Sequence, residues 1–177
     1  MNAIGNWLLD RLPPERDLER NELVELATAL GRERALWEEH VRHDPNERYF
    51  LQLYRDVHLD VWLICWLDAQ DTGYHDHDLS SGAVYVVDGT LAEERFHFDG
   101  EQLRTTVRER PAGDVFDFDA SYIHLMRHAG TGPATSIHAY SPALWRMGYY
   151  ERDAAGDLCR TSITYMDEVA EGAAHSV

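Results

Sequence analysis

The sequence has little of what would direct a chain to a membrane or stabilise it through disulfide bonds. No apolar run approaches the roughly 20 residues that cross a bilayer. Residues 1–11 lack the basic start, apolar core and small-residue cleavage site of a secretory signal. Only two cysteines are present, and we interpret Cys65, inside the apolar run 61–66, as a buried free thiol. These absences predict a cytoplasmic protein without membrane association.

Positive charge is also scarce. The 177 residues include 16 basic side chains against 32 acidic ones, which gives a formal net charge of −16. A field of this sign opposes phosphate backbones and anionic lipids, so we expect neither a nucleic-acid partner nor a membrane partner. An anionic substrate would therefore need local positive charge, which a metal ion or a few arginines could supply.

The chain also lacks an internal repeat, a low-complexity tract and a Pro/Gly/Ser-rich linker, which indicates one domain. A hydrophobic content of 44% is enough for a real core. Apolar side chains recur near helical spacing over residues 17–43, where Gly31 is interpreted as the separation between two helices. We divide the single domain (1–177) into an N-terminal helical segment (1–46), a β-barrel core (47–155) and a C-terminal extension (156–177).

From Arg48 onward, short runs of β-forming residues alternate with turn residues such as Asp88-Gly89 and Asp99-Gly100. Many short strands at this spacing are typical of a β-sandwich or barrel, so the expected fold is mainly β with short N-terminal helices. The predicted strands cover residues 49–54, 57–66, 83–87, 91–98, 103–109, 114–118, 136–140 and 147–151.

Three histidines give the strongest chemical signal. His75 and His77 are two residues apart, so on a strand their side chains project from the same face. His124, from a later strand, would complete a facial set of three nitrogens that leaves the other side of a metal open. Neutral imidazole suits iron, zinc, copper and nickel, so the ligand types alone do not identify the ion. His128, four residues after His124, is interpreted as a structural residue.

The residues around these histidines are similar to the two motifs of cupins. The tripeptide His75-Asp76-His77, followed by Gly82 and Gly89, has the spacing of the first motif, and His124 falls where the second motif supplies its histidine. Ordinary cupins often place a glutamate ligand where this chain has Gly82. Its loss leaves three neutral ligands and the full positive charge of the metal.

A second group, Ser136, His138 and Tyr140, alternates along a predicted strand, so all three side chains face one way. A tyrosine hydroxyl over a metal can donate a proton or a hydrogen bond, and His138 and Ser136 can orient it in turn. Taken with the histidine pattern, this Ser-x-His-x-Tyr signature followed by Ser-Pro resembles the cysteine dioxygenase family of thiol dioxygenases, from about residue 48 to residue 151.

The resemblance implies a cupin barrel, or double-stranded β-helix, with Fe(II) held by His75, His77 and His124. It implies an enzyme that adds both atoms of O2 to the sulfur of a small thiol acid, with L-cysteine converted to cysteine sulfinate as the first expectation. The same chemistry on 3-mercaptopropionate or mercaptosuccinate stays open, as does a non-dioxygenase metal cupin that acts as an isomerase or small-acid sensor. Vertebrate members crosslink a cysteine at the Gly82 position to the signature tyrosine, and this chain cannot form that bond.

The family also implies a residue that binds the substrate carboxylate, and the sequence offers three candidates. Arg48 and Arg55 are both possible, and Arg48 is favoured by its distance from Trp66 and because an arginine fork binds carboxylates well. Gln52, on the same strand face as Arg48, is the alternative found in mercaptopropionate-specific members. The aromatic segment 145–150 fits either core packing or a lid. The oligomeric state stays open between a monomer and a small homo-oligomer.

Overall fold

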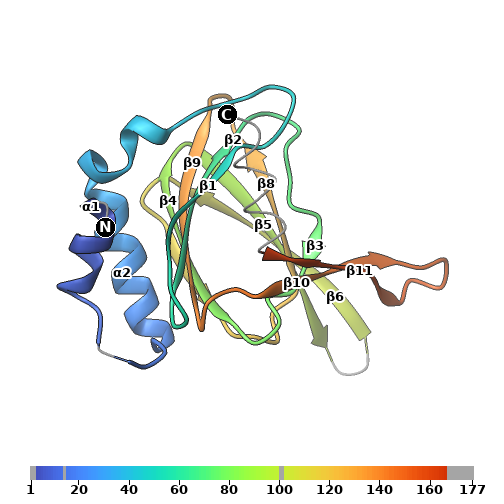
Figure 1. Cartoon of the computed structure of the whole chain (residues 1–177). Coiled ribbons are helices and arrows are strands. Elements are labelled where there is room, and N and C mark those ends of the chain that lie inside the picture. Colours follow the sequence, from blue (N-terminus) through green and yellow to red (C-terminus); the bar gives the residue numbers. More distant parts are fainter. Residues whose placement is uncertain (1–2, 14, 100–101, 167–177) are drawn as a thin grey trace.

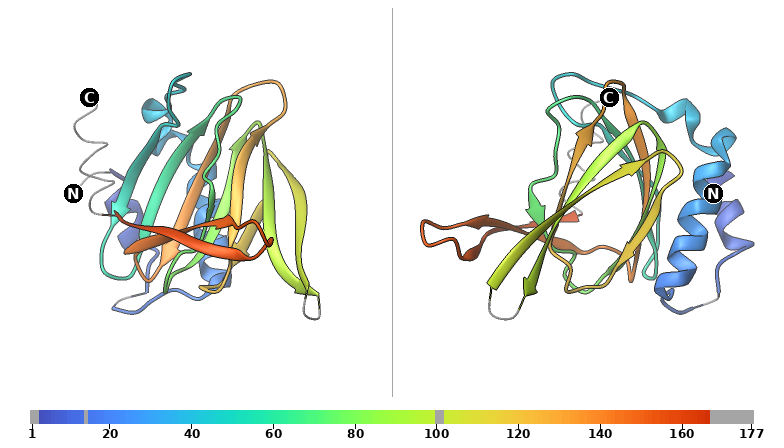
Figure 2. Two further views of the ribbon diagram at one scale, coloured as in Figure 1. Left: turned by 90° about the vertical axis from the view of Figure 1, so that its right-hand side faces the viewer. Right: turned by 180° about the vertical axis from the view of Figure 1, so that it is seen from behind.

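Two antiparallel β-sheets face each other in the computed structural model, and the helices cover the outside of one of them (Figure 1). The model describes residues 3–13, 15–99 and 102–166. One sheet has five strands in the order β1-β2-β9-β4-β7, and the other has six in the order β11-β10-β3-β8-β5-β6. Figure 2 shows the β10–β11 ribbon projecting from the barrel on the side away from the helices. The mainly β architecture predicted from the sequence is confirmed.

The helical elements are α1 (Ala3–Leu9), α2 (Arg20–Arg32) and the 3₁₀ turns η1 (Arg34–Leu36) and η2 (Glu38–His40). The strands are β1 (Phe50–Arg55), β2 (Asp60–Trp66), β3 (Tyr74–His75), β4 (Ser81–Asp88), β5 (Thr90–Asp99), β6 (Gln102–Pro111), β7 (Val115–Phe118), β8 (His124–Ala129), β9 (Ala134–Ser141), β10 (Arg146–Arg152) and β11 (Leu158–Tyr165).

Each strand range predicted from the sequence is occupied by a strand, but those ranges did not include β3, β8 and β11. β3 is only two residues long, and β11 is largely exposed, so neither has the apolar alternation that identifies a half-buried strand. β11 pairs with β10 and forms the described part of the C-terminal extension. Residues 167–177 of that extension lie outside the described residues.

Residues 17–43, where apolar side chains recur at helical spacing, contain one regular helix, α2, whose apolar side packs on β4, β7 and β9. Gly31 lies inside α2 and does not separate two helices, contrary to the expectation from the sequence. A Cβ at Gly31 would lie 2.3 Å from Cδ1 of Tyr85 on β4. The glycine therefore lets the helix lie close to the sheet. The helix itself ends one residue later, at Arg32.

Strand β9 is buried over its whole length and separates two layers of the core. Ile137 and Ala139 belong to the apolar cluster between the sheet and the helices, whereas Tyr140 belongs to the cluster between the two sheets. Because side chains alternate along a strand, Ser136 and His138 share the inner face with Tyr140. The strand thus carries the predicted polar group into the barrel interior.

No helix among the described residues has the length and apolar character of a membrane span.

We expect Gly31→Ala to lower the free energy of unfolding by about 1–2 kcal/mol. Overpacking against the buried Tyr85 ring should outweigh the ~1 kcal/mol that alanine gains over glycine as a helix former. Urea unfolding followed by circular dichroism measures the change. Gly132→Ala is the control, because its added Cβ meets no atom within 4 Å, and it should stay within about 0.5 kcal/mol of the parent. A stabilised Gly31→Ala protein would contradict the close packing of α2 on β4.

Candidate metal centre

Three buried histidines converge inside the barrel. His75 ends β3, His124 begins β8, and the two are directly paired across the antiparallel strands. His77 follows β3 in the chain. One ring nitrogen from each histidine lies within 4.8 Å of those of the other two. The structure therefore brings together the three residues that the sequence predicted as metal ligands.

The position of His77 differs from the expectation that both histidines of the pair lie on one strand. β3 stops at His75, and His77 lies in the turn that follows, where its carbonyl accepts a hydrogen bond from Ser80 N at 3.0 Å. Asp78, next in the chain, has a positive φ of 54°. The turn, rather than strand alternation, aims His77 at the same point as His75.

Asp76 points away from the metal-binding group and fastens this turn to the β10–β11 ribbon. Its Oδ1 accepts a hydrogen bond from Gly148 N at 3.1 Å. Its Oδ2 accepts from Tyr150 Oη at 2.5 Å and from Arg160 Nη2 at 2.6 Å. The residue between His75 and His77 thus anchors the turn to the ribbon.

The ring nitrogens of the group fit a metal ion. Nδ1 of His75 contacts the Gly73 carbonyl at 3.0 Å, which leaves Nε2 free for a metal. His77 is fully buried, and neither of its ring nitrogens has a hydrogen-bond partner among the described residues. An unpaired buried polar group costs about 1–3 kcal/mol, which a bound cation would offset.

The pKa values of His75 and His77 also fit metal binding. Burial lowers the pKa of His75 to about 3, and burial also holds the pKa of His77 well below its ordinary value. Both rings are therefore neutral at physiological pH, and neutral imidazole is the form that coordinates a metal.

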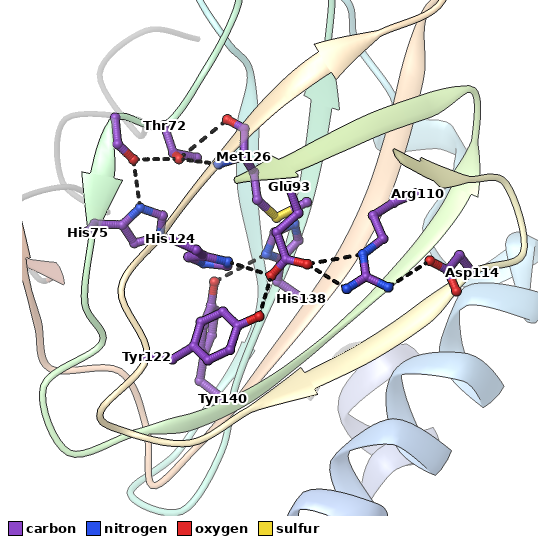
Figure 3. A network of polar contacts seen from close by, with 11 residues as sticks. Thr72, His75, Glu93, Arg110, Asp114, Tyr122, His124, Met126, His138 and Tyr140 are labelled. Atoms are coloured by element: carbon purple, nitrogen blue, oxygen red, sulfur yellow. Dashed lines mark hydrogen bonds and ion pairs between the residues drawn. The ribbon is translucent and has the colours of Figure 1, made fainter. Parts of the chain in front are cut away.

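His124 is held from behind by a carboxylate that sequence reasoning missed. Its Nδ1 lies 3.1 Å from Oε1 of Glu93 on β5 (Figure 3). Burial alone would raise the pKa of Glu93, but hydrogen bonds from His124 and Arg110 lower it to about 2, so the side chain is ionised. The sequence feature that could have identified Glu93 is its position two residues after Leu91, which places both side chains on the inward face of one strand. An acidic residue there must find a partner inside.

Ser136, His138 and Tyr140 form one hydrogen-bonded chain. The Trp66 indole donates to Ser136 Oγ at 2.9 Å, and Ser136 Oγ lies 2.9 Å from Nε2 of His138. Nδ1 of His138 lies 3.2 Å from the Tyr140 hydroxyl. Burial lowers the pKa of His138 well below its ordinary value and raises that of Tyr140, so both are neutral. The Tyr140 ring stacks on His77 with ring centroids 5.3 Å apart.

A cavity of about 240 Å³ opens onto this group. Its wall includes His75, His124, His138 and Tyr140, with Arg48 as the only charged side chain among its described lining residues. The remaining lining is mostly apolar: Phe50, Trp62, Ile64, Thr72, Met126, Leu144, Met147, Tyr149 and Met166. Among the described residues, the cavity is thus an apolar chamber with one cation and two of the three grouped histidines.

The three candidates for carboxylate binding lie in different surroundings. Arg48 donates to the Asp71 carbonyl, and its guanidinium lies over the Trp66 ring at 5.0 Å. Burial lowers the pKa of Arg48. Arg55 and Gln52 instead bind the fully buried carboxylate of Asp60, at 3.2 Å and 3.0 Å. Neither is among the described residues that line the cavity.

The segment 145–150 both packs and lines the cavity. Met147 and Tyr149 face the cavity, whereas Trp145 is exposed and its ring lies against Tyr165 at 5.8 Å between centroids. On the other side of the group, a Cβ at Gly82 would lie 2.4 Å from the Phe118 ring. An aromatic ring therefore fills the space beside Tyr140 that a longer residue at position 82 would need.

We expect His124→Ala to lose metal, because only two candidate ligands remain and Glu93 loses one of its three partners. Metal analysis of protein loaded with Fe(II) under anaerobic conditions measures this. His128→Asn is the matched control, since His128 Nε2 contacts the Gly132 carbonyl at 2.7 Å and is not part of the ligand group. Parent-level metal in His124→Ala would contradict the ligand assignment.

Comparison with solved structures shows what fold the barrel shares with other proteins. A conserved protein from Klebsiella pneumoniae with a double-stranded β-helix domain has a TM-score of 0.52 at 16% identity, covering 72% of this chain and 86% of that one. A cupin superfamily protein from Desulfitobacterium hafniense, also 16% identical, covers 74% of this chain and 94% of its own, with a TM-score of 0.46. At such low identity the first likeness shows the fold alone, and it confirms the predicted double-stranded β-helix barrel.

Sequence comparison goes further than the fold. Cysteine dioxygenase type 1 from Danio rerio is 26% identical over 90 residues, which cover 47% of this chain and 45% of that protein. The matched part thus spans a little under half the length of this curated relative. A family model described as cysteine dioxygenase type I matches residues 9–153, a range that includes the three histidines and the Ser-x-His-x-Tyr group. The chain belongs to the cysteine dioxygenase type I family.

Proposed function

We propose that this protein is an Fe(II)-dependent thiol dioxygenase that converts R–SH and O2 into the sulfinic acid R–SO2H. The observation that supports this best is one apolar cavity whose described wall includes two of the three grouped histidines, the neutral Tyr140 hydroxyl and one arginine, Arg48. When bound by three neutral imidazoles, Fe(II) would supply adjacent open positions for a thiolate and dioxygen. Both oxygen atoms and the thiol proton remain in the product, so no other reactant is needed.

Tyr140 would act as a hydrogen-bond donor into the cavity. An indole can only donate, so Ser136 accepts from Trp66 and keeps its own proton for Nε2 of His138. Nδ1 of His138 then carries a proton and donates it to the Tyr140 oxygen. The phenolic proton of Tyr140 is left to point at the substrate carboxylate or at dioxygen, where it can assist the reaction.

Arg48 would bind the substrate carboxylate. The buried Nε of Arg48 has no hydrogen-bond partner among the described residues, so an anion in the cavity would compensate its charge. Since no second cation lines the described cavity wall, a thiol with one carboxylate fits better than mercaptosuccinate. The second carboxylate of mercaptosuccinate would be buried unpaired, at a cost of several kcal/mol. L-Cysteine is the first substrate to test and 3-mercaptopropionate the second.

Tyr140→Phe should keep its iron and lose turnover by about 10²- to 10⁴-fold, because it removes only the proton donor. Oxygen consumption and sulfinate formation by iron-loaded protein, with L-cysteine, 3-mercaptopropionate and mercaptosuccinate, measure this. Tyr54→Phe is the control, since the Tyr54 hydroxyl bonds Asp56 outside the cavity. If the parent protein with full iron occupancy oxidises no member of a broad thiol panel, the proposed function fails. Stoichiometric zinc in that protein would then favour a different cupin activity.

Arg48→Gln should lower kcat/KM for the preferred thiol acid by about 10- to 100-fold. A charge-assisted hydrogen bond contributes about 1.5–3 kcal/mol, and each 1.4 kcal/mol is a factor of ten. The methyl ester of the same acid, which has no carboxylate charge, should lose little. Arg55→Gln tests the alternative, because Arg55 is bound to Asp60. A larger loss in Arg55→Gln than in Arg48→Gln would reverse the assignment.

A further inference from the structure

Glu93 is a buried carboxylate whose oxygens are both used, with 2% of its surface exposed. Oε1 lies 3.1 Å from His124 Nδ1 and accepts from the Tyr122 hydroxyl at 2.9 Å. Oε2 accepts from Arg110 Nη2 at 2.5 Å and from Arg110 Nε at 3.1 Å (Figure 3). Arg110 is itself fixed by Asp114, whose Oδ2 accepts from Nη1 at 3.1 Å.

The fold supplies these partners from three separate places. β5 lies between β8 and β6, so Glu93 reaches His124 on one neighbouring strand and Arg110 on the other. Tyr122 comes from the loop before β8, and its ring stacks on Phe118 at 5.4 Å between centroids. A carboxylate with donors on three sides has one orientation, so its contact with His124 is preformed.

The three candidate ligands differ in what lies behind them. Nδ1 of His75 contacts a neutral backbone carbonyl, and His77 has no hydrogen-bond partner among the described residues. His124 alone in the group contacts an ionised side chain. A carboxylate that accepts from Nδ1–H fixes the ring tautomer, points Nε2 toward the metal and makes it a stronger donor.

We propose that Glu93 is a positioning residue of the metal centre, which fixes His124 as a ligand through Nε2 and supplies from behind the ring the negative charge that the ligand set lacks. The glutamate that ordinary cupins often use as a ligand would fall at the position of Gly82 in this chain. Here Arg110 and Tyr122 hold the carboxylate of Glu93 away from the cavity, so it acts through His124. The inference rests on the metal site of the proposed function but not on its thiol chemistry.

The test is Co²⁺ binding to metal-free protein, followed by the visible absorption of the ion. Glu93→Gln keeps the size of the side chain and removes its charge, so we expect Co²⁺ affinity to fall about 10- to 100-fold, with a changed spectrum. Glu109→Gln is the matched control, because it removes the same charge from the exposed face of β6 and should leave affinity and spectrum unchanged. Glu93→Gln with parent affinity and an identical spectrum would overturn the proposal.

A second measurement uses the parent protein, so it decides the case even if Glu93→Gln does not fold. Long-range ¹H–¹⁵N spectra of the Zn²⁺-loaded protein should show His124 protonated at Nδ1, with that proton shifted far downfield by the carboxylate. A proton on Nε2 of His124 would overturn the proposal. Neither measurement involves thiol or oxygen. A protein that passes both and oxidises no thiol would therefore contradict the proposed function alone.

Discussion

The burial of three histidines at one point is the constraint on which the rest of the structure depends. Polar groups inside a protein need partners, and each imidazole has two nitrogens to satisfy. His75 and His124 use one nitrogen on a carbonyl and a carboxylate, while His77 has none satisfied by the described residues. One nitrogen of each ring lies within 4.8 Å of those of the other two rings. Ring nitrogens that are buried without a partner destabilise the folded protein, and a cation bound between them would offset that cost.

The barrel provides the rigidity that such a group requires. β9 carries apolar residues toward the helices and polar ones toward the metal-binding group, so one strand serves both the core and the site. Asp76 ties the turn that presents His77 to the β10–β11 ribbon, and Glu93 ties His124 to β5 and β6. The ligands are therefore held by contacts that reach both edges of the six-stranded sheet. Ligands held rigidly in this way would all stay on one side of a bound metal and leave its other side open.

The sequence predicted the parts of the site that depend on spacing along one segment. Ser136, His138 and Tyr140 alternate on a single strand, and their common face follows from the period of two. The place of Glu93 beside His124 depends on which strands are neighbours, which local patterns do not reveal. Gly31 was misread for a related reason. A glycine in a helical pattern usually signals a break, but here it leaves room for the Tyr85 ring, which comes from a strand far along the chain.

Turnover under ¹⁸O₂ tests whether both oxygen atoms of the sulfinate come from one dioxygen molecule. Iron-loaded protein would be given its preferred thiol in normal water, and the sulfinate would be analysed by mass spectrometry. We expect two ¹⁸O atoms in each product molecule, because both atoms of one dioxygen go to the sulfur. A product that carries one ¹⁸O atom, or none, would mean that water supplies oxygen and would contradict dioxygenation at this centre.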